Sequence, residues 1–393
     1  MMKKLAVVFE DSIFDRKGAF RAKMERARNL ALLKSAQVDI WCIQTSYTWV
    51  ERLLLGQRFF DGVPESRLGR PKELVIDGLK LNMIWMNYSI LDHFLFFKLK
   101  LRPLLYPRFL RRQAPLFAEY DLISAHAFEG GFLAREVNKR YGVPYCVTWH
   151  GSDIHTKPFK YPCIRQLTAE LMAGAKMNFF VSKALMDTSD EIGSGNKQVL
   201  YNGCGKAFYR FDEAKRKELR KKYQLDGSPV VGFVGNLEHI KNVAILPSLF
   251  AGIQNYYGAP VTCWIIGDGR ERASIQAAMQ GTCRFFGNLP PESMPEIYNC
   301  LDLLVLPSLN EGMPLVILEA LSCGCRAVGS KVGGIPEVLD EAHCVALGED
   351  FTDRFSRVAA AALSAPFSQS IPAGLSWEET ARKEFTIFAQ SWQ

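Results

Sequence analysis

The alternation of short apolar runs with longer amphipathic segments constrains the fold of this chain most strongly. Strands are predicted in the first half at residues 5–9, 38–43, 122–125, 145–148 and 178–181. In the second half they are predicted at residues 230–234, 261–266, 284–286, 303–306 and 326–329. Helical patterns lie between most of them, as at residues 20–34 and 131–141. Alternation of this kind predicts parallel sheets covered by helices.

The alternation occurs twice, and the length of the chain agrees with two domains. A chain of 393 residues exceeds the ~250–300 residues at which a single core stops growing. A charged, helix-friendly segment at residues 212–224 precedes the first strand of the second half and is predicted to connect the domains. The sequence therefore predicts an α/β protein with two doubly wound domains that face a cleft.

Charge is distributed unevenly along the chain. Residues 1–226 carry 38 basic and 24 acidic side chains, whereas residues 227–393 carry 10 and 17. Within the basic half, residues 94–112 interleave aromatic side chains with six cations. This composition is typical of a peripheral contact with an anionic membrane. Burial of the apolar face in a core, with solvated cations outside, explains the same pattern.

The ten cysteines are scattered, without a Cys-x-x-Cys pair, so we expect reduced thiols in a cytoplasm. Five apolar residues at the N-terminus are ended by Glu10 and Asp11, which indicates a first strand rather than a signal peptide. No run of 18 apolar residues occurs, so we expect no membrane span. The expected location is cytoplasmic, including the inner face of the plasma membrane.

Two carboxylates mark a candidate ligand site in the second half. Glu311 follows a predicted strand and precedes a Gly-x-Pro turn, and Glu319 lies eight positions further on in a predicted helix. Backbone N–H groups at a helix start are unpaired and can receive phosphate or sugar oxygens. The alternative is an ordinary strand–helix junction with solvated acids.

Two more strand ends of the second half carry candidate groups. Gly235 and Asn236 end one strand, and Lys241 lies just beyond, where its charge could meet a diphosphate. A solvated lysine at a helix start explains Lys241 as well. Phe286 and Gly287 end another strand and could lie beside a nucleobase, although a phenylalanine there is more often part of the core.

The first half places two histidines at neighbouring strand ends. His126 precedes a glycine pair, and His150 is followed by Gly-Ser and Asp153. Both strand ends are expected at the carboxyl edge of one sheet, and Gly18 follows the first strand at the same edge. A lone histidine is usually structural, but two at adjacent strand ends favour a functional role.

Several motifs in order along the chain resemble the family-4 retaining glycosyltransferases of the GT-B fold. They are His-Gly-Ser-Asp at 150–153, Asn-Gly at 202–203, Gly-x-Leu-x-x-x-Lys at 235–241, Gly-Asp-Gly at 267–269, Pro-Ser-x-Asn-Glu-Gly-Met-Pro at 307–314 and Gly-Gly-Ile-Pro-Glu at 333–337. The resemblance extends to Ser-Trp-Glu at 376–378 and is strongest to bacterial enzymes of capsule, exopolysaccharide or O-antigen synthesis. It implies two Rossmann-like domains, an acceptor-side domain at 1–207 and a donor-binding domain at 208–375. Residues 376–393 would form a helix that packs back on the first domain.

The resemblance also implies roles for matching residues. Lys241 would bind the donor diphosphate, Glu311 would contact the transferred sugar, and Glu319 would bind the ribose. His126 would lie near the transferred sugar and act as a catalytic residue with Lys241 and Glu311. His150 and Asp153 would line the acceptor side. The remaining donor-binding positions would be Gly18, Gly235, Asn236, Phe286, Gly287, Gly312, Met313, Pro314 and Leu315.

Two features qualify the chemistry that the resemblance implies. The family usually has arginine where this chain has Asn236, so one cation is missing from the expected diphosphate clamp. The chain has no Asp-x-Asp pair, so neither a metal ion nor another cofactor is expected.

We therefore expect a retaining transfer of sugar from a UDP- or GDP-sugar to a glycan or lipid-linked acceptor in cell-surface polysaccharide synthesis. Nucleic acid is not expected as a partner. The alternatives are a GT-B nucleotide-sugar epimerase or hydrolase, and a catalytically weak subunit that only binds a nucleotide-sugar.

Overall fold

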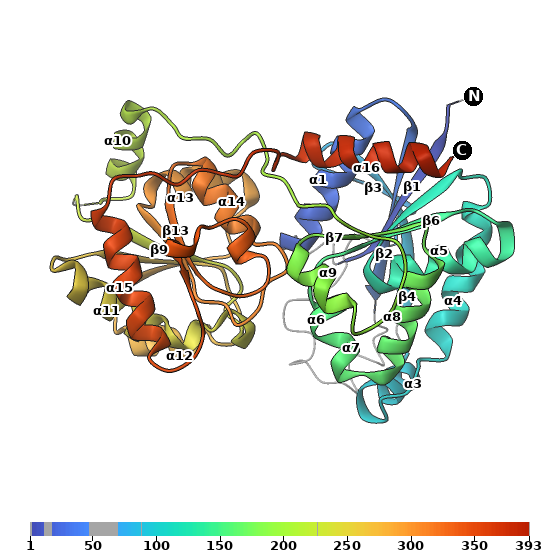
Figure 1. Cartoon of the computed structure of the whole chain (residues 1–393), viewed down its shortest axis with the longest axis horizontal. Helices are drawn as coiled ribbons and strands as arrows, with labels where there is room; N and C mark the ends of the chain where they lie inside the picture. Colours follow the sequence, from blue (N-terminus) through green and yellow to red (C-terminus); the bar gives the residue numbers. More distant parts are fainter. Residues whose placement is uncertain (1, 12–17, 47–69, 88, 226, 393) are drawn as a thin grey trace. The chain divides into compact units, whose positions relative to one another are not determined.

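The computed structural model describes residues 2–11, 18–46, 70–87, 89–225 and 227–392. The chain divides into two compact units (Figure 1). Unit 1 comprises Met1–Asn202 and Trp377–Gln393, and unit 2 comprises Gly203–Ser376. The predicted divisions, at 207/208 and 375/376, lie within a few residues of these positions.

The segment predicted to connect the domains is instead part of unit 2. It forms helix α10 (Glu213–Lys222). This helix is held by Arg216, which donates to the carbonyl of Asn299, and by Arg220, which pairs with Asp302 at 3.1 Å. The prediction was wrong because a dense run of charges is also typical of a solvated linker. In the structure most of these charges lie on the solvated face of α10, while Arg216 and Arg220 hold the helix against unit 2.

The sheet of unit 1 has eight strands in the order β3-β4-β2-β1-β5-β6-β7-β8. All neighbours are parallel except the antiparallel pair β3–β4. The strands are β1 (Lys4–Glu10), β2 (Gln37–Ser46), β3 (Glu73–Ile76), β4 (Leu79–Asn87), β5 (Leu122–His126), β6 (Tyr145–Trp149), β7 (Met177–Phe180) and β8 (Lys197–Val199). Each strand predicted in the first half is present, and β3, β4 and β8 were not predicted.

Two of the unpredicted strands form a hairpin around Asp77 and Gly78. Both turn residues have positive φ, 50° and 77°, as a two-residue hairpin turn requires. The Asp-Gly dipeptide is a known signal for this turn, so the hairpin could have been found from the sequence.

Helices of unit 1 lie between its strands and at the C-terminus. They are α1 (Gly18–Leu32), α3 (Ile90–His93), α4 (Leu105–Gln113), α5 (Ala127–Tyr141), α6 (Ser152–His155), α7 (Lys157–Lys160), α8 (Pro162–Gly174), α9 (Lys183–Ser189) and α16 (Trp377–Ser391). A π-helical turn covers Phe94–Lys98, and a 3-10 turn covers Ala114–Phe117. The described residues include no helix that is both long and apolar enough to cross a membrane.

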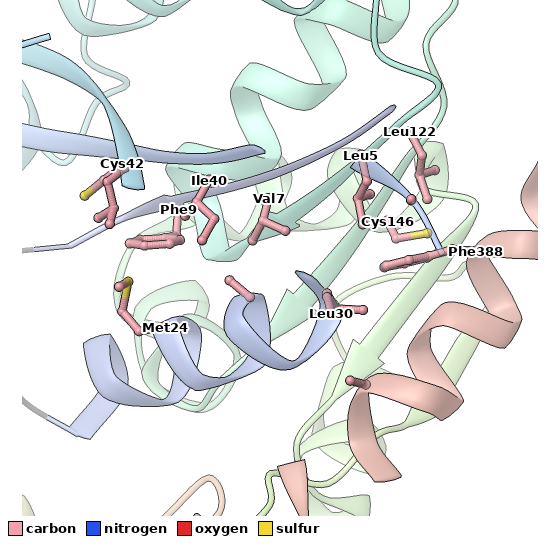
Figure 2. Packing of buried hydrophobic residues seen from close by; sticks show 14 of the residues in the cluster. Leu5, Val7, Phe9, Met24, Leu30, Ile40, Cys42, Leu122, Cys146 and Phe388 are labelled. Atoms are coloured by element: carbon pink, nitrogen blue, oxygen red, sulfur yellow. The ribbon is translucent and has the colours of Figure 1, made fainter. Parts of the chain in front are cut away.

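The core of unit 1 forms between β1, α1 and the C-terminal helix (Figure 2). Alternate residues of β1 share one face of the sheet, and Leu5, Val7 and Phe9 on that face are fully buried. Met24 of α1 and Phe388 of α16 join the same cluster. Because α16 supplies a fully buried side chain to this core, the last helix of the chain is an integral part of unit 1.

Unit 2 contains a six-stranded, fully parallel sheet in the order β11-β10-β9-β12-β13-β14. The strands are β9 (Val230–Val234), β10 (Thr262–Ile266), β11 (Cys283–Gly287), β12 (Leu303–Leu306), β13 (Arg326–Ser330) and β14 (Cys344–Val345). Besides α10, the helices are α11 (Leu246–Tyr257), α12 (Arg272–Met279), α13 (Met294–Cys300), α14 (Leu315–Ser322) and α15 (Phe351–Ser364). The five strands predicted in the second half are all present.

The parallel strands of each sheet reverse their order once. The reversal falls between β9 and β12 in unit 2 and between β1 and β5 in unit 1. In open α/β sheets, ligands bind beyond the carboxyl ends of the strands at such a reversal. The two reversals therefore locate one candidate site in each unit.

Candidate functional site

The site of unit 2 is built around an ion pair between Lys241 and Glu311. Lys241 ends a 3-10 turn (His239–Lys241) after β9, and Glu311 lies in the loop after β12. The Lys241 ammonium is 2.6 Å from Oε1 of Glu311, and the two side chains are 23% and 9% exposed. An ammonium has three N–H donors, so Lys241 can hold Glu311 and still donate to a ligand oxygen.

Two buried serines hold the carboxylate of Glu311 in place. Ser308 donates from its hydroxyl to Oε1 of Glu311 at 2.7 Å, and the hydroxyl of Ser330 donates to the carbonyl of Ser308. Both serines are fully buried. The chain of contacts fixes the acid that neutralises Lys241, so the ammonium has a defined position before any ligand binds.

A glycine of the Gly-Gly-Ile-Pro-Glu motif at 333–337 supports the loop that carries Glu311. Gly333 has a φ of +51°, and a Cβ there would lie 1.9 Å from the backbone oxygen of Glu311. Only glycine fits this contact without moving the loop. Ser308, Ser330 and Gly333 were not assigned to the site from the sequence, although Ser308 and Gly333 lie in the motifs that carried the resemblance.

Beyond Glu311 the chain enters helix α14. Gly312, Met313 and Pro314 are buried, and the helix begins at Leu315 without a side-chain cap. Its first N–H groups are therefore available to oxygen ligands. Glu319, 4% exposed, accepts a hydrogen bond from the phenol of Tyr298 at 2.9 Å.

The loops after β9, β10 and β11 lie against one another. The backbone N–H of Leu237 donates to the carbonyl of Asp268, and the N–H of Gly267 donates to the carbonyl of Gly287. A Cβ on Gly267 would lie 2.0 Å from the backbone oxygen of Gly235. The predicted residues Gly235 and Gly287 are thus brought together through Gly267, which the prediction had not assigned.

Phe286 has contacts with other aromatic side chains. Its ring packs edge-on against Trp264, with centroids 4.7 Å apart, and the guanidinium carbon of Arg284 lies 4.8 Å from its centroid. Neighbouring Arg272 is paired with Asp268 at 2.6 Å. Asn236 is half-buried, and its backbone carbonyl accepts a hydrogen bond from the N–H of Glu238. The position at which the family resemblance implies arginine therefore presents a neutral side chain.

The site of unit 1 contains both predicted histidines in direct contact. His126 is the last residue of β5, and His150 directly follows β6. Nδ1 of His126 lies 2.8 Å from Nε2 of His150, and the rings stack with centroids 5.1 Å apart. Burial lowers the pKa of both imidazoles well below the usual value, and for His126 the neighbouring His150 lowers it further.

His126 also has an unused ring nitrogen. The residue is 1% exposed, and its Nε2 has no hydrogen-bond partner among the described residues. A buried polar atom without a partner is costly, so this nitrogen is suited to a ligand hydroxyl.

The carboxylate of Asp153 stabilises the turn after β6. Its carboxylate accepts from the backbone N–H of His150, at 2.9 and 3.1 Å, and from that of Gly151 at 2.6 Å. Asp153 is 4% exposed. Its predicted acceptor-side role would therefore act through the position of His150. Gly18 is the first residue of α1.

Three ionisable groups at the same sheet edge were not predicted. Glu10 ends β1, Glu129 lies in the first turn of α5, and buried Lys23 donates to the backbone carbonyl of Glu10 at 2.9 Å. Burial, with a further contribution from Glu129, raises the pKa of Glu10 to about 7. The signal in the sequence was an acid placed directly after the first strand. In the described part of the chain, no cluster of three or more His, Cys, Asp or Glu could hold a metal ion.

The chain matches two family models. Residues 24–205 match the description "glycosyl transferase 4-like domain", and residues 228–364 match "glycosyl transferases group 1". The first match lies almost entirely within unit 1 and the second lies within unit 2.

Curated relatives carry glycosyltransferase names. A putative teichuronic acid biosynthesis glycosyltransferase, TuaC, of Bacillus subtilis is 27% identical over 55% of this chain and 54% of its own. An O-antigen chain mannosyltransferase B of Escherichia coli is 28% identical over 70% of this chain and 75% of its own. The alignments span only 54% and 62% of the length of the first two relatives, TuaC and a 2-deoxystreptamine glucosyltransferase of Streptomyces kanamyceticus.

Solved structures share the fold over the whole chain. A sucrose-phosphate synthase from Thermosynechococcus elongatus has a TM-score of 0.70 at 14% identity, with 99% of each chain covered. Anabaena Alr3699/HepE in complex with UDP and glucose has a TM-score of 0.64 at 16% identity, covering 100% of this chain and 98% of its own. At these identities the likeness concerns the fold alone, which is GT-B.

Proposed function

Because this chain belongs to the family-4 glycosyltransferases of the GT-B fold, we propose that it transfers a sugar from a UDP- or GDP-sugar to a glycan or lipid-linked acceptor, with retention of configuration. Relatives named for teichuronic acid and O-antigen synthesis support a role in cell-surface polysaccharide. In this proposal unit 2 holds the donor and unit 1 holds the acceptor.

The Lys241–Glu311 pair is the observation that carries the proposal. It lies where the strand order of unit 2 reverses, directly before the uncapped start of α14. An ammonium and a row of backbone N–H groups are the two features that stabilise a departing diphosphate without a metal ion. We propose that the reaction uses neither a metal nor another cofactor, in keeping with the lack of an Asp-x-Asp pair.

The proposed reaction exchanges one bond at C1 of the donor sugar. The bond from C1 to the phosphate oxygen breaks, and the acceptor hydroxyl oxygen bonds to C1 on the same face. The hydroxyl proton passes to the departing phosphate oxygen, so no protein nucleophile is needed. Lys241 and the N–H groups of α14 balance the charge on the nucleoside diphosphate, and Glu311 contacts the transferred sugar.

The neutral His126 is proposed to bind a hydroxyl of the transferred sugar through its Nε2, which has no partner in the described part of the chain. The contact with His150 holds the ring in place, and one of the two facing nitrogens carries the shared proton. On the donor side, Glu319 is proposed to receive the ribose hydroxyls, and the backbone around Gly287 to border the base.

We also propose that unit 1 touches an anionic membrane surface from the cytoplasmic side. In the segment 91–105, six apolar side chains are between 43% and 53% exposed: Leu91, Phe94, Leu99, Leu101, Leu104 and Leu105. Lys98, Lys100 and Arg102 lie among them and are exposed as well. Apolar side chains beside cations fit the interface of an anionic bilayer.

Donor turnover tests the proposal. Release of nucleoside diphosphate is measured for a panel of UDP- and GDP-sugars, with free monosaccharides and prenyl-diphosphate-linked sugars as acceptors. We expect Lys241→Ala and Glu311→Gln each to lower kcat by about 100-fold or more, because each removes fixed charge from the donor site. The anomeric configuration of the product is read by NMR.

Unit 2 offers a matched control pair. Lys331 and Glu341 are also 2.6 Å apart but are 42% and 77% exposed, so Lys331→Ala and Glu341→Gln should leave turnover within about twofold. Free sugar or an epimerised donor formed without acceptor would support the hydrolase or epimerase alternative. Donor binding without consumption by any acceptor would support a binding subunit, and an inverted product would refute retention.

A further inference from the structure

Unit 1 contains a large cavity that the donor chemistry does not use. Its volume is about 840 Å³, and described residues of unit 1 line it. Contributions come from the ends of β1 and β2, the start of α5, the segment 96–111 and helices α7 and α8. The cavity thus reaches from the carboxyl edge of the sheet to the exposed apolar segment 91–105.

Part of the cavity wall is built from apolar and aromatic side chains. Phe128 and Phe132 of α5 are 4% and 6% exposed. Phe96 stacks on Tyr161 with ring centroids 4.6 Å apart, and Ile164 and Leu167 of α8 add aliphatic surface to the lining. A small glycan offers mostly hydroxyl groups, whereas walls of this kind favour an apolar ligand body.

The cations around the cavity fall into two groups. Arg102, Arg111 and Arg135 form ion pairs with Glu136 and Glu170. Arg108, Lys157 and Lys160 also line the cavity and are exposed, and no ion pair is recorded for them within the described ranges. The six cations of the lining outnumber the four carboxylates that line the cavity or pair with them, Glu10, Glu129, Glu136 and Glu170. The described residues therefore leave a net positive charge that an anionic ligand group would neutralise.

One end of the cavity is acidic. Glu10 and Glu129 line it, and the hydroxyl of Thr45 donates to Oε1 of Glu10 at 3.1 Å. Because the pKa of Glu10 is raised to about 7, this carboxyl can both accept and donate hydrogen bonds near neutral pH. Such a pair of acids suits the hydroxyl groups of a sugar.

The apolar lining continues to the outside of the molecule. Leu104 lines the cavity and is also 48% exposed, and its neighbour Leu105 is 43% exposed. An apolar chain could therefore leave the cavity along the segment that we propose to touch the membrane.

We propose that this cavity binds an amphiphile with a polyprenyl-type apolar chain and a phosphate or diphosphate group. The chain lies against the phenylalanine walls, and the anion meets Arg108, Lys157 and Lys160. Under the proposed function, on which this assignment of role rests, the ligand is the lipid carrier of the acceptor sugar, and its hydroxyl groups reach Glu10 and Glu129.

Direct binding tests the cavity without any sugar transfer. Calorimetry on the full chain compares geranylgeranyl diphosphate with geranylgeraniol, which lacks the anion, and with inorganic diphosphate, which lacks the chain. We expect geranylgeranyl diphosphate to bind at least about tenfold more tightly than either, because burial of the chain and pairing of the charge both contribute. Leu167→Ser should weaken geranylgeranyl diphosphate and leave inorganic diphosphate unchanged.

Exposed lysines provide the charge test with little risk to folding. The double variant Lys157→Ala/Lys160→Ala should weaken geranylgeranyl diphosphate by roughly tenfold. The matched control is Arg140→Ala/Lys176→Ala, which removes two exposed cations of unit 1 outside the cavity and should bind as the wild type does.

The outcomes separate this inference from the proposed function. Absent binding of geranylgeranyl diphosphate, binding of inorganic diphosphate with equal affinity, or equal affinities of the test and control variants would overturn the cavity assignment, even if nucleotide-sugar turnover is observed. Tight binding that the Lys157→Ala/Lys160→Ala variant weakens would support it, even if no nucleotide-sugar is ever consumed and the proposed function fails.

Discussion

A buried ion pair between the first and last helices of unit 1 should govern the stability of that unit. Nε of Arg26 in α1 donates to Oε2 of Glu384 in α16 at 2.7 Å, and the side chains are 1% and 0% exposed. Ser124 of β5 donates to the other carboxylate oxygen at 3.3 Å. The perturbation is Glu384→Gln, which keeps the shape of the side chain and removes its charge.

The expected cost follows from burial. Removing one partner of a buried pair leaves an uncompensated charge and typically costs about 3–5 kcal/mol. Lys183 and Asp187 provide the matched comparison, because their atoms are also 2.7 Å apart while the side chains are 64% and 54% exposed. Asp187→Asn should cost at most about 0.5 kcal/mol.

Hydrogen exchange at increasing urea concentration, read for peptides of α1, reports the unfolding of unit 1 separately from unit 2. A double variant Arg26→Met/Glu384→Leu should recover most of the loss, because it leaves no buried charge. A cost below about 1 kcal/mol for Glu384→Gln, similar to that of Asp187→Asn, would refute the reasoning.

Three further perturbations have definite expected outcomes. Because the pKa of Glu10 is raised from 4.5 to about 7, the native state holds this proton more tightly than the unfolded chain, and stability should fall as pH rises through that range. The free energy of unfolding in urea should therefore be larger at about pH 5 than at about pH 8, and Glu10→Gln should reduce this difference by about 1–3 kcal/mol. An unchanged difference would contradict the raised pKa of Glu10. Asn236→Arg should tighten nucleotide-sugar binding by roughly threefold to tenfold, measured by calorimetry, because it restores a second cation; unchanged affinity would mean that another group already supplies the charge. Gly333→Ala, whose Cβ would lie 1.9 Å from the Glu311 oxygen, should lower kcat by about tenfold or more, whereas Gly258→Ala, at a φ of +77° in open space, should cost only about 1 kcal/mol of stability and leave kcat unchanged.

The candidate site of unit 2 could be located from the sequence because its parts are local. Lys241 and Glu311 each follow a strand that is visible in the sequence as one continuous apolar run. Parallel strands bring their carboxyl ends to one edge of the sheet. The strand pattern therefore predicts that the two residues lie at the same sheet edge, whereas the ion pair between them was not predicted and came from the structure. The supporting contact of Gly333 needed the structure, because a close approach between two loops leaves no periodic signal.

Other features were outside the reach of local patterns. The charge run of α10 predicted a connecting segment, although the sequence does not record that Arg216 and Arg220 attach it to unit 2. Asp153 belongs to the same motif as His150, but its carboxylate accepts hydrogen bonds from backbone N–H groups of the turn. Which polar group meets a ligand and which one stabilises a turn depends on orientation in three dimensions.

The sequence by itself determined the number of units, their α/β class and the strand ends that carry the candidate site residues, because residue periodicity and turn chemistry act over a few positions. Only the tertiary structure decided which distant residues meet. Arg26 pairs with Glu384, 358 positions away, and His126 stacks on His150. Segments from β1 to α8 line one cavity that combines apolar side chains with cations. Such contacts arise when whole elements pack, and packing depends on the shape of the folded unit rather than on any local pattern.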